Sequence, residues 1–166
     1  MRTVLRHSLL IVLLLATAPG VWAGSELEPA PSFVARTTTG EKFTNETVKG
    51  KVVLLQFWTT WCPYCRREQS MIDDLYKEFS GKGLVLLAID VGESKKKVKQ
   101  YLDQNPRSVP IVYMEDTNLA ARYAAKSYPI YVVINREGKI AAIQHGAGGE
   151  RALRQMLSEA GLESED

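Results

Sequence analysis

Two nearly continuous apolar segments, Lys51–Trp58 and Leu84–Ile89, constrain the fold of this chain most. Strands that are apolar on successive residues are typical of parallel strands covered on both faces. Between them, from Pro63 to about Phe79, apolar side chains recur at three- and four-residue spacing, which predicts a helix with one buried side. A strand, a helix and a strand in this order imply a parallel pair with a right-handed crossover.

The rest of the chain adds elements on both sides of this unit. The expected elements are a hairpin of Phe33–Thr37 with Lys42–Thr44, a helix capped by Ser94, a short strand Pro110–Met114, a helix Thr117–Lys126, a hairpin of Ile130–Ile134 with Lys139–Ile143, and a closing helix Gly149–Ala160. Parallel and antiparallel strands therefore share one sheet, and 166 residues are enough for one domain with its own core.

The chain has two cysteines, Cys62 and Cys65, at the predicted junction between the first apolar strand and its helix. A pair at this spacing can open and close a small disulfide loop at a helix N-terminus, where a thiolate is stabilised. A structural disulfide would gain little from so short a loop. A zinc site would need further ligands, and the two histidines, His7 and His145, have no neighbouring partner. The pair therefore predicts thiol–disulfide exchange.

Position along the helix assigns roles to the residues around the pair. Cys62, at the helix N-terminus, is the expected nucleophile, and Cys65, one turn deeper, is expected to resolve the mixed disulfide. Pro63 in the first turn costs no hydrogen bond. Glu68 follows Cys65 by three residues and could relay its proton, although from position alone an ordinary surface glutamate fits as well.

Four further residues are candidates for the site. Trp61 and Tyr64 flank the sulfurs and offer contact surface for a partner chain, although such aromatics also serve in packing. Tyr128 and Pro129 precede an apolar strand, where a proline is tolerated at the first position. Gln56, polar within the first apolar strand, is expected at the active-site end or in a hydrogen-bonded niche of the core.

The N-terminus has the pattern of a signal peptide over residues 1–23: basic residues, an apolar segment Ser8–Ala16, and small residues before a cleavage point between Ala23 and Gly24. A membrane anchor is the alternative, but the apolar segment is shorter than the ~20 residues that cross a bilayer. We expect a flexible lead-in over 24–32, the domain over 33–160 and an acidic tail over 161–166.

Charge and composition exclude several classes of function. A net charge of +2 with mixed signs, and no aromatic residues within a basic stripe, argue against nucleic-acid binding. Lys95–Lys97 fits a solvated helix face, with docking of an acidic partner as the alternative. The sequence indicates no dimer surface, so we expect a monomer, and no cofactor apart from the Cys62–Cys65 disulfide.

Three segments, Phe57–Glu68, Val91–Ser94 and Tyr128–Lys139, together resemble the thioredoxin superfamily, in particular its exported TlpA/ResA-like branch. The resemblance implies a thioredoxin-like three-layer α/β fold, with a central mixed sheet flanked by helices and an extra N-terminal β-hairpin. It implies an exposed nucleophile Cys62, a resolving Cys65 and a cis peptide bond before Pro129. It also implies that Glu68 tunes the cysteines.

The resemblance further implies an extracytoplasmic, periplasmic protein disulfide reductase. Its partners would be exported proteins with disulfides, including apocytochrome c during cytochrome c maturation, and a membrane-bound thiol that donates electrons. The chain departs from the branch in its Pro63-Tyr64 dipeptide, which resembles that of glutaredoxins, and in Tyr128, where thioredoxins commonly have threonine. These positions affect the reduction potential and the choice of partner. A disulfide oxidase or isomerase is therefore an alternative function. From another class, a copper chaperone would use Cys62, Cys65 and His145.

Overall fold

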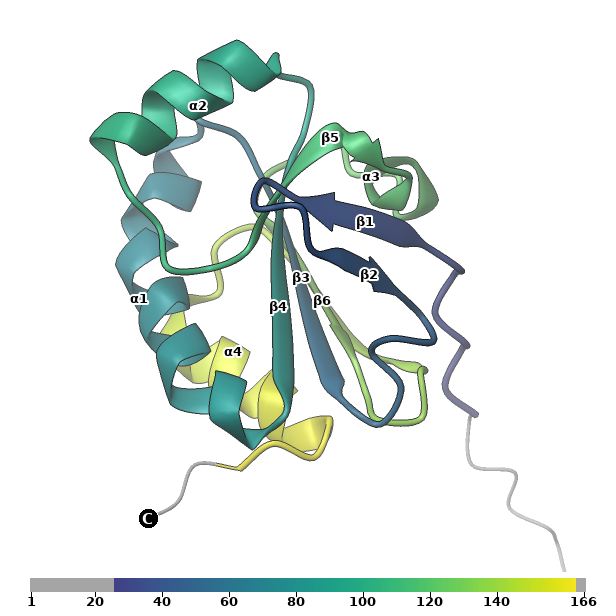
Figure 1. The fold of residues 1–166 in the computed structure, drawn as a ribbon. Helices are drawn as coiled ribbons and strands as arrows, with labels where there is room; N and C mark the ends of the chain where they lie inside the picture. Colours follow the sequence, from purple (N-terminus) through teal and green to yellow (C-terminus); the bar gives the residue numbers. More distant parts are fainter. Residues whose placement is uncertain (1–25, 164–166) are drawn as a thin grey trace, which may run out of the picture.

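The computed structural model describes residues 26–163, which form one seven-stranded sheet with helices on both faces (Figure 1). Across the sheet the strand order is β2-β1-β5-β4-β3-β6-β7. The strands are β1 (Val34–Thr37), β2 (Lys42–Thr44), β3 (Val52–Trp58), β4 (Leu84–Asp90), β5 (Ile111–Thr117), β6 (Ile130–Ile134) and β7 (Ile140–His145). The helices are α1 (Pro63–Phe79), α2 (Lys95–Gln104), α3 (Leu119–Arg122) and α4 (Gly149–Glu159), with a 3-10 turn η1 (Ser80–Lys82) after α1. The predicted signal peptide lies outside the described residues.

Strands β3 and β4 lie at the centre of the sheet, and every residue of both is buried. They pair in parallel, with Leu54 beside Leu86, as the two apolar segments predict. On its other edge β3 pairs antiparallel with β6, where Leu55 meets Val132. The sheet is therefore mixed, and the predicted three-layer α/β class is confirmed.

The two faces of the sheet carry separate cores. Alternate residues of β3 point to opposite faces, so Leu54 packs with α1, α2 and α4, while Leu55 packs with α3 and the N-terminal segment. Figure 1 shows the same division, with α1, α2 and α4 on one side of β4 and α3 on the other side. The face that carries α1 and α4 also carries both cysteines.

The predicted N-terminal hairpin is present, since Ala35 of β1 pairs with Phe43 of β2. The lead-in lies against the edge of the sheet. Ala30 donates a backbone hydrogen bond of 2.9 Å to Gly138, and Ile140 donates one of 2.8 Å to Glu28. The edge of β7 offers free backbone groups, and the lead-in uses them.

The region after β5 also differs from expectation, since the helix predicted over Thr117–Lys126 shrinks to α3, a single turn, and β5 extends to Thr117. Thr117 pairs with Ala35 of the hairpin, so strand pairing takes residues that favoured the helix. The positive φ of 46° at Ala124 is incompatible with a continuing right-handed helix.

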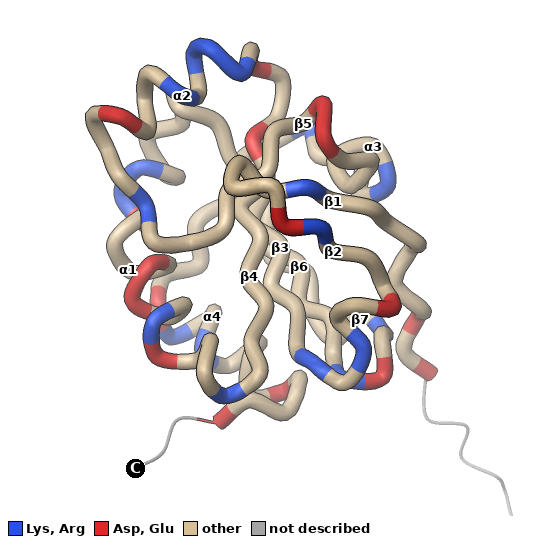
Figure 2. The backbone as a smooth tube through the Cα atoms, viewed as in Figure 1, with Lys and Arg blue, Asp and Glu red and all other residues tan. Residues whose placement is uncertain are grey.

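In the view of Figure 2, lysine and arginine positions are interspersed with acidic positions along the backbone. Lys95–Lys97 begins α2, and two of its members are already paired, Lys95 with Asp116 at 3.1 Å and Lys97 with Glu93 at 2.6 Å. Among residues 26–163, none of the helices has the length and apolar character needed to span a membrane.

Candidate active site

Cys62 is the N-cap residue of α1 and forms a disulfide with Cys65, and the two Cα atoms lie 5.3 Å apart. The backbone N–H of Cys65 points at Cys62 Sγ over 3.1 Å, and Pro63 occupies the first turn, where no amide is needed. When the pair is reduced, this amide and the helix dipole stabilise negative charge on Cys62. The sequence-predicted position of the pair is confirmed.

The exposure of the cysteines corrects one expectation. Cys62 is only 3% exposed, and Cys65 is fully buried, so the expected exposed nucleophile is in fact covered in the disulfide form. The cover is the segment before Pro129: the carbonyl oxygen of Tyr128 lies 3.6 Å from Cys62 Sγ. Cys62 is nevertheless the more accessible of the two sulfurs.

The Tyr128–Pro129 peptide bond is cis, as the resemblance implies. Tyr128 is half-buried and meets Trp61 edge-on, with ring centroids 6.0 Å apart. Trp61 and Tyr64 are 58% and 53% exposed, so neither belongs to the core. Around the disulfide the structure therefore brings together Trp61, Tyr64 and Tyr128, the aromatic residues that the sequence singled out.

Glu68 is not a surface glutamate, although position on the helix allowed that reading. Its side chain is buried on the inner side of α1, and both carboxylate oxygens are occupied. The hydroxyl of Tyr131 donates to Oε2 over 2.6 Å, and the backbone N–H of Gly149 donates to Oε1 over 2.7 Å. Glu68 lies one helical turn after Cys65, at the spacing where side chains on a helix are neighbours.

Gln56 occupies the hydrogen-bonded niche predicted for it, because its Nε2 donates to the hydroxyl oxygen of Tyr131 over 3.4 Å. Tyr131 itself was missed by the sequence analysis, and it is fully buried on β6, two residues after Pro129. Burial, with the neighbouring Glu68, raises the pKa of Tyr131 above its ordinary value, so the hydroxyl stays a donor. A hydroxyl within an otherwise apolar strand was the available signal.

Asp90 is a second acidic residue near the segment that leads into Cys62, and the sequence analysis did not identify it. Asp90 ends β4, is fully buried, and has no hydrogen-bond partner for either carboxylate oxygen among residues 26–163. Burial raises the pKa of Asp90 to about 7, repulsion from Glu93 adds to this effect, and Lys97 opposes it. The signal was an acidic residue that directly follows the apolar segment Leu84–Ile89.

Glu93 ties this acidic group to the active-site segment. The backbone N–H and hydroxyl of Thr60 donate to its carboxylate over 2.5 and 2.8 Å, and Lys97 pairs with it at 2.6 Å. Burial by itself raises the pKa of Glu93, but the hydrogen bonds from Lys97 and Thr60 outweigh it, so the pKa lies below its ordinary value. Glu93 is therefore a buried anion that holds Thr60, two residues before Cys62.

The copper alternative lacks its third ligand. Within residues 26–163 there is no group of three or more histidine, cysteine, aspartate or glutamate side chains that could hold a metal ion. His145 is exposed at the end of β7 and is not grouped with Cys62 and Cys65. Copper binding by these three residues is therefore not proposed.

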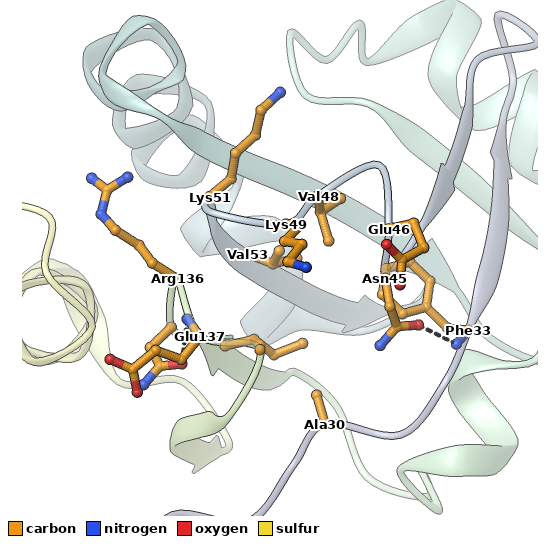
Figure 3. A pocket seen from close by; sticks show the side chains of 13 residues that line it. Ala30, Phe33, Asn45, Glu46, Val48, Lys49, Lys51, Val53, Arg136 and Glu137 are labelled. Carbon is orange, nitrogen blue, oxygen red and sulfur yellow. Dashed lines mark hydrogen bonds between the residues drawn. The ribbon is translucent and has the colours of Figure 1, made fainter.

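A pocket of about 280 Å³ lies at the opposite end of β3, where Ala30, Phe33, Val48 and Val53 form an apolar floor (Figure 3). Its rim carries charges of both signs, and Asn45 there accepts a hydrogen bond of 2.8 Å from the backbone of Phe33. Val53 is the second residue of β3 and Cys62 follows the end of that strand, so this pocket is separate from the disulfide.

The AhpC/TSA family profile matches residues 27–143, which include the disulfide and the cis peptide bond. The chain belongs to the AhpC/TSA family. It is 32% identical to thiol–disulfide oxidoreductase ResA of Bacillus subtilis over an alignment of 165 residues. That alignment covers 95% of this chain and 92% of the relative. Together with the Cys62–Cys65 pair, this places the chain among the ResA-like thiol–disulfide oxidoreductases, as the sequence resemblance implies.

Solved structures agree with this assignment. A thiol:disulfide interchange protein of the thioredoxin family from Chlorobium tepidum superposes with a TM-score of 0.73 at 25% identity, covering 83% of this chain and 99% of that one. The exposed lipoprotein thioredoxin Etrx1 of Streptococcus pneumoniae gives a TM-score of 0.69 at 26% identity, over 78% of this chain and 99% of that one. The thioredoxin-like fold is thereby confirmed.

Proposed function

We propose that this ResA-like oxidoreductase reduces disulfide bonds of exported proteins, and that apocytochrome c is among its substrates. The observation that carries the proposal is the Cys62–Cys65 disulfide at the N-terminus of α1, beside the carbonyl oxygen of Tyr128. The direction of the reaction rests on the resemblance to the TlpA/ResA-like branch.

The proposed reaction has two exchange steps. The Cys62 thiolate attacks one sulfur of the substrate disulfide, that bond breaks, and the departing substrate thiolate takes up a proton. Cys65 then loses its proton, for which Glu68 is the proposed acceptor, and attacks Cys62 Sγ. The second substrate thiol leaves, and the enzyme disulfide forms. A membrane-bound thiol donor then supplies two electrons and restores the reduced pair.

The surface around the disulfide fits a polypeptide substrate. Trp61 and Tyr64, which lie before and after Cys62 in the sequence, have exposed rings. Tyr128, beside the cis peptide bond, meets the Trp61 ring edge-on. The guanidinium of Arg67 lies 4.6 Å from the centre of the Tyr64 ring and holds it in place. We propose that Trp61, Pro63, Tyr64 and Tyr128 contact the substrate chain, and that Pro129 positions it opposite the sulfurs.

The experiment that tests the direction is the equilibrium reduction potential of the Cys62–Cys65 pair in dithiothreitol and glutathione buffers, read by thiol alkylation. A value near or below about −270 mV, that of thioredoxin, supports a reductase, and a value near about −120 mV overturns it. Reduction of an oxidised Cys-x-x-Cys-His peptide tests the substrate class, because this motif is the haem-attachment sequence. The Cys62→Ser variant serves as the inactive control.

An oxidase is the second candidate, and one observation favours it. The Cys65 amide points at Cys62 Sγ over 3.1 Å, and Gln56 is a neutral residue in the buried strand before the motif. The amide stabilises the Cys62 thiolate and hence the reduced form, which makes a pair more oxidising, and the neutral Gln56 does not oppose this effect. The same potential measurement decides between the two directions.

We also propose that the chain acts outside the cytoplasm. The support is the signal-peptide pattern of residues 1–23 and the likeness to a protein described as an exposed lipoprotein thioredoxin. Expression of the full chain in a bacterium, followed by fractionation and N-terminal sequencing, should yield a periplasmic protein that begins at Gly24. Retention of residues 1–23 in the membrane fraction would instead indicate an anchor.

A further inference from the structure

We propose that Tyr131 is a positioning residue for Glu68, and that its hydroxyl holds that carboxylate in the orientation that accepts the proton of Cys65 during the resolving step. The inference rests on the proposed function, because it concerns the proton acceptor in that step. It assigns a role to a residue whose hydroxyl binds Glu68 and Gln56.

The first argument is the geometry of the carboxylate. Tyr131 on β6 binds Oε2 over 2.6 Å, and the first residue of α4, Gly149, binds Oε1 over 2.7 Å. Glu68 itself belongs to α1, so three elements fix one side chain. A carboxylate with a donor on each oxygen has a defined orientation.

The second argument is the support behind the hydroxyl. Gln56 on β3 donates to Tyr131 Oη over 3.4 Å, so the chain of donors runs from Gln56 through Tyr131 to Glu68. A hydroxyl that accepts one hydrogen bond becomes a better donor in the next. Gln56 and Tyr131 are fully buried and Glu68 is 8% exposed, so bulk water does not readily replace a missing member.

The third argument concerns the chemistry of the step. When Cys65 attacks Cys62 Sγ, its thiol proton passes to Glu68, which must be charged to accept it. Loss of the Tyr131 hydroxyl leaves Oε2 without its donor and lets the carboxylate turn away from the orientation that receives the proton. A hydrogen bond to a charged group corresponds to about a tenfold change in a rate that depends on it. Tyr131→Phe is therefore expected to slow the resolving step by about that factor.

The experiment follows the two steps separately in the reduced protein. On mixing with dithiobisnitrobenzoate, Cys62 attacks and releases the first thionitrobenzoate, and Cys65 then attacks Cys62 Sγ and releases the second. The rate of the second release is measured by stopped-flow absorbance as a function of pH, for wild type, Tyr131→Phe, Glu68→Gln and the double variant. In the Glu68→Gln background, Tyr131→Phe is expected to slow this release no further, because its effect acts through the carboxylate.

Tyr123→Phe is the matched control. Tyr123 also has a buried hydroxyl, which has no hydrogen-bond partner within residues 26–163, and it packs on Phe57 on the opposite face of the sheet. Its removal should leave the rate of the second release unchanged. An equal loss of rate in Tyr123→Phe, or the same loss with and without Glu68, would show a general effect on packing and overturn the proposal.

If Tyr131→Phe does not fold, Gln56→Leu replaces it, since that change removes only the donor behind the hydroxyl. A smaller loss of rate is expected, and superimposable profiles for wild type and Gln56→Leu overturn the inference. Failure of this inference can be distinguished from failure of the proposed function. The resolving step is measured without any protein substrate, whereas the reductase proposal fails on the reduction potential and on the peptide assay.

Discussion

Glu93 accepts two hydrogen bonds from Thr60, one of 2.5 Å from the backbone N–H and one of 2.8 Å from the hydroxyl. On the other side of the same residue, Arg66 Nε donates to the Thr60 carbonyl oxygen over 2.7 Å. Thr60 is thus held from α1 and from the segment just before α2. Because Cys62 follows two residues later, this clamp fixes the approach to the nucleophile.

Glu93→Gln should loosen this clamp. The change removes the charge that pairs with Lys97 at 2.6 Å and weakens the acceptor for Thr60, so we expect a loss of about 1 to 2 kcal/mol of unfolding free energy. Urea unfolding measures it. Glu115→Gln is the control, because that carboxylate is 60% exposed in its pair with Lys95 and should matter little. Equal losses in both variants would contradict a specific role for Glu93.

Asp90 makes stability depend on pH. The unfolded chain releases this proton near the ordinary pKa of 3.8, whereas the folded chain keeps it up to a pKa of about 7. Between these values the folded state holds one more proton, so stability falls as pH rises, by up to about 1.4 kcal/mol per pH unit, and levels off above the folded pKa. Asp90→Asn should remove this slope. The unfolding free energy of the variant should therefore rise relative to that of wild type as pH rises from 4 to 8.

Chemical unfolding at several pH values checks this expectation. Asp103→Asn is the control, since Asp103 is exposed and paired with Lys99 at 2.9 Å, and its substitution should leave the slope in place. Glu93→Gln should shift the window to lower pH, because the charge of Glu93 contributes to the raised pKa of Asp90. Parallel curves for wild type and Asp90→Asn would show that Asp90 does not titrate in this window.

Asp73 neutralises a buried arginine. Arg107 is 2% exposed in its side chain, donates to Asp73 Oδ1 over 2.9 Å, and lies 5.8 Å from the centre of the Trp58 ring. Asp73→Ala leaves that charge without its partner, so we expect a loss of about 3 kcal/mol or more. The adjacent Asp74→Ala breaks only an exposed pair with Lys77 and should cost below about 1 kcal/mol. Thermal and urea unfolding compare the two, and similar losses would refute the assignment.

The two cysteines should differ as single variants. Cys65→Ser leaves Cys62 able to attack but removes the resolving thiol, so mixed disulfides with substrate proteins should accumulate. Cys62→Ser should form none, because Cys65 is fully buried one turn deeper in α1. Non-reducing gels with mass spectrometry of the captured chains provide the measurement. Capture by Cys62→Ser at the level of Cys65→Ser would reverse the proposed roles.

Local pattern was enough for the elements that build the framework. The apolar runs predict β3 and β4, the spacing of buried residues predicts α1 from Pro63 to Phe79, and Cys62 and Cys65 follow from their place at that junction. Where two local preferences competed, the pattern failed. Residues up to Thr117 joined β5 because Ala35 lies beside them in the sheet.

By itself the sequence determined the fold class, the cysteine pair and the helix that presents it, because all three depend on neighbours along the chain. The tertiary structure decided the environment of each ionisable group. Glu68 meets Tyr131 and Gly149 from 63 and 81 residues away, and Glu93 meets Thr60 from 33 residues away. Burial and hydrogen bonding set the proton affinity of a carboxylate, and both come from residues that only folding brings together.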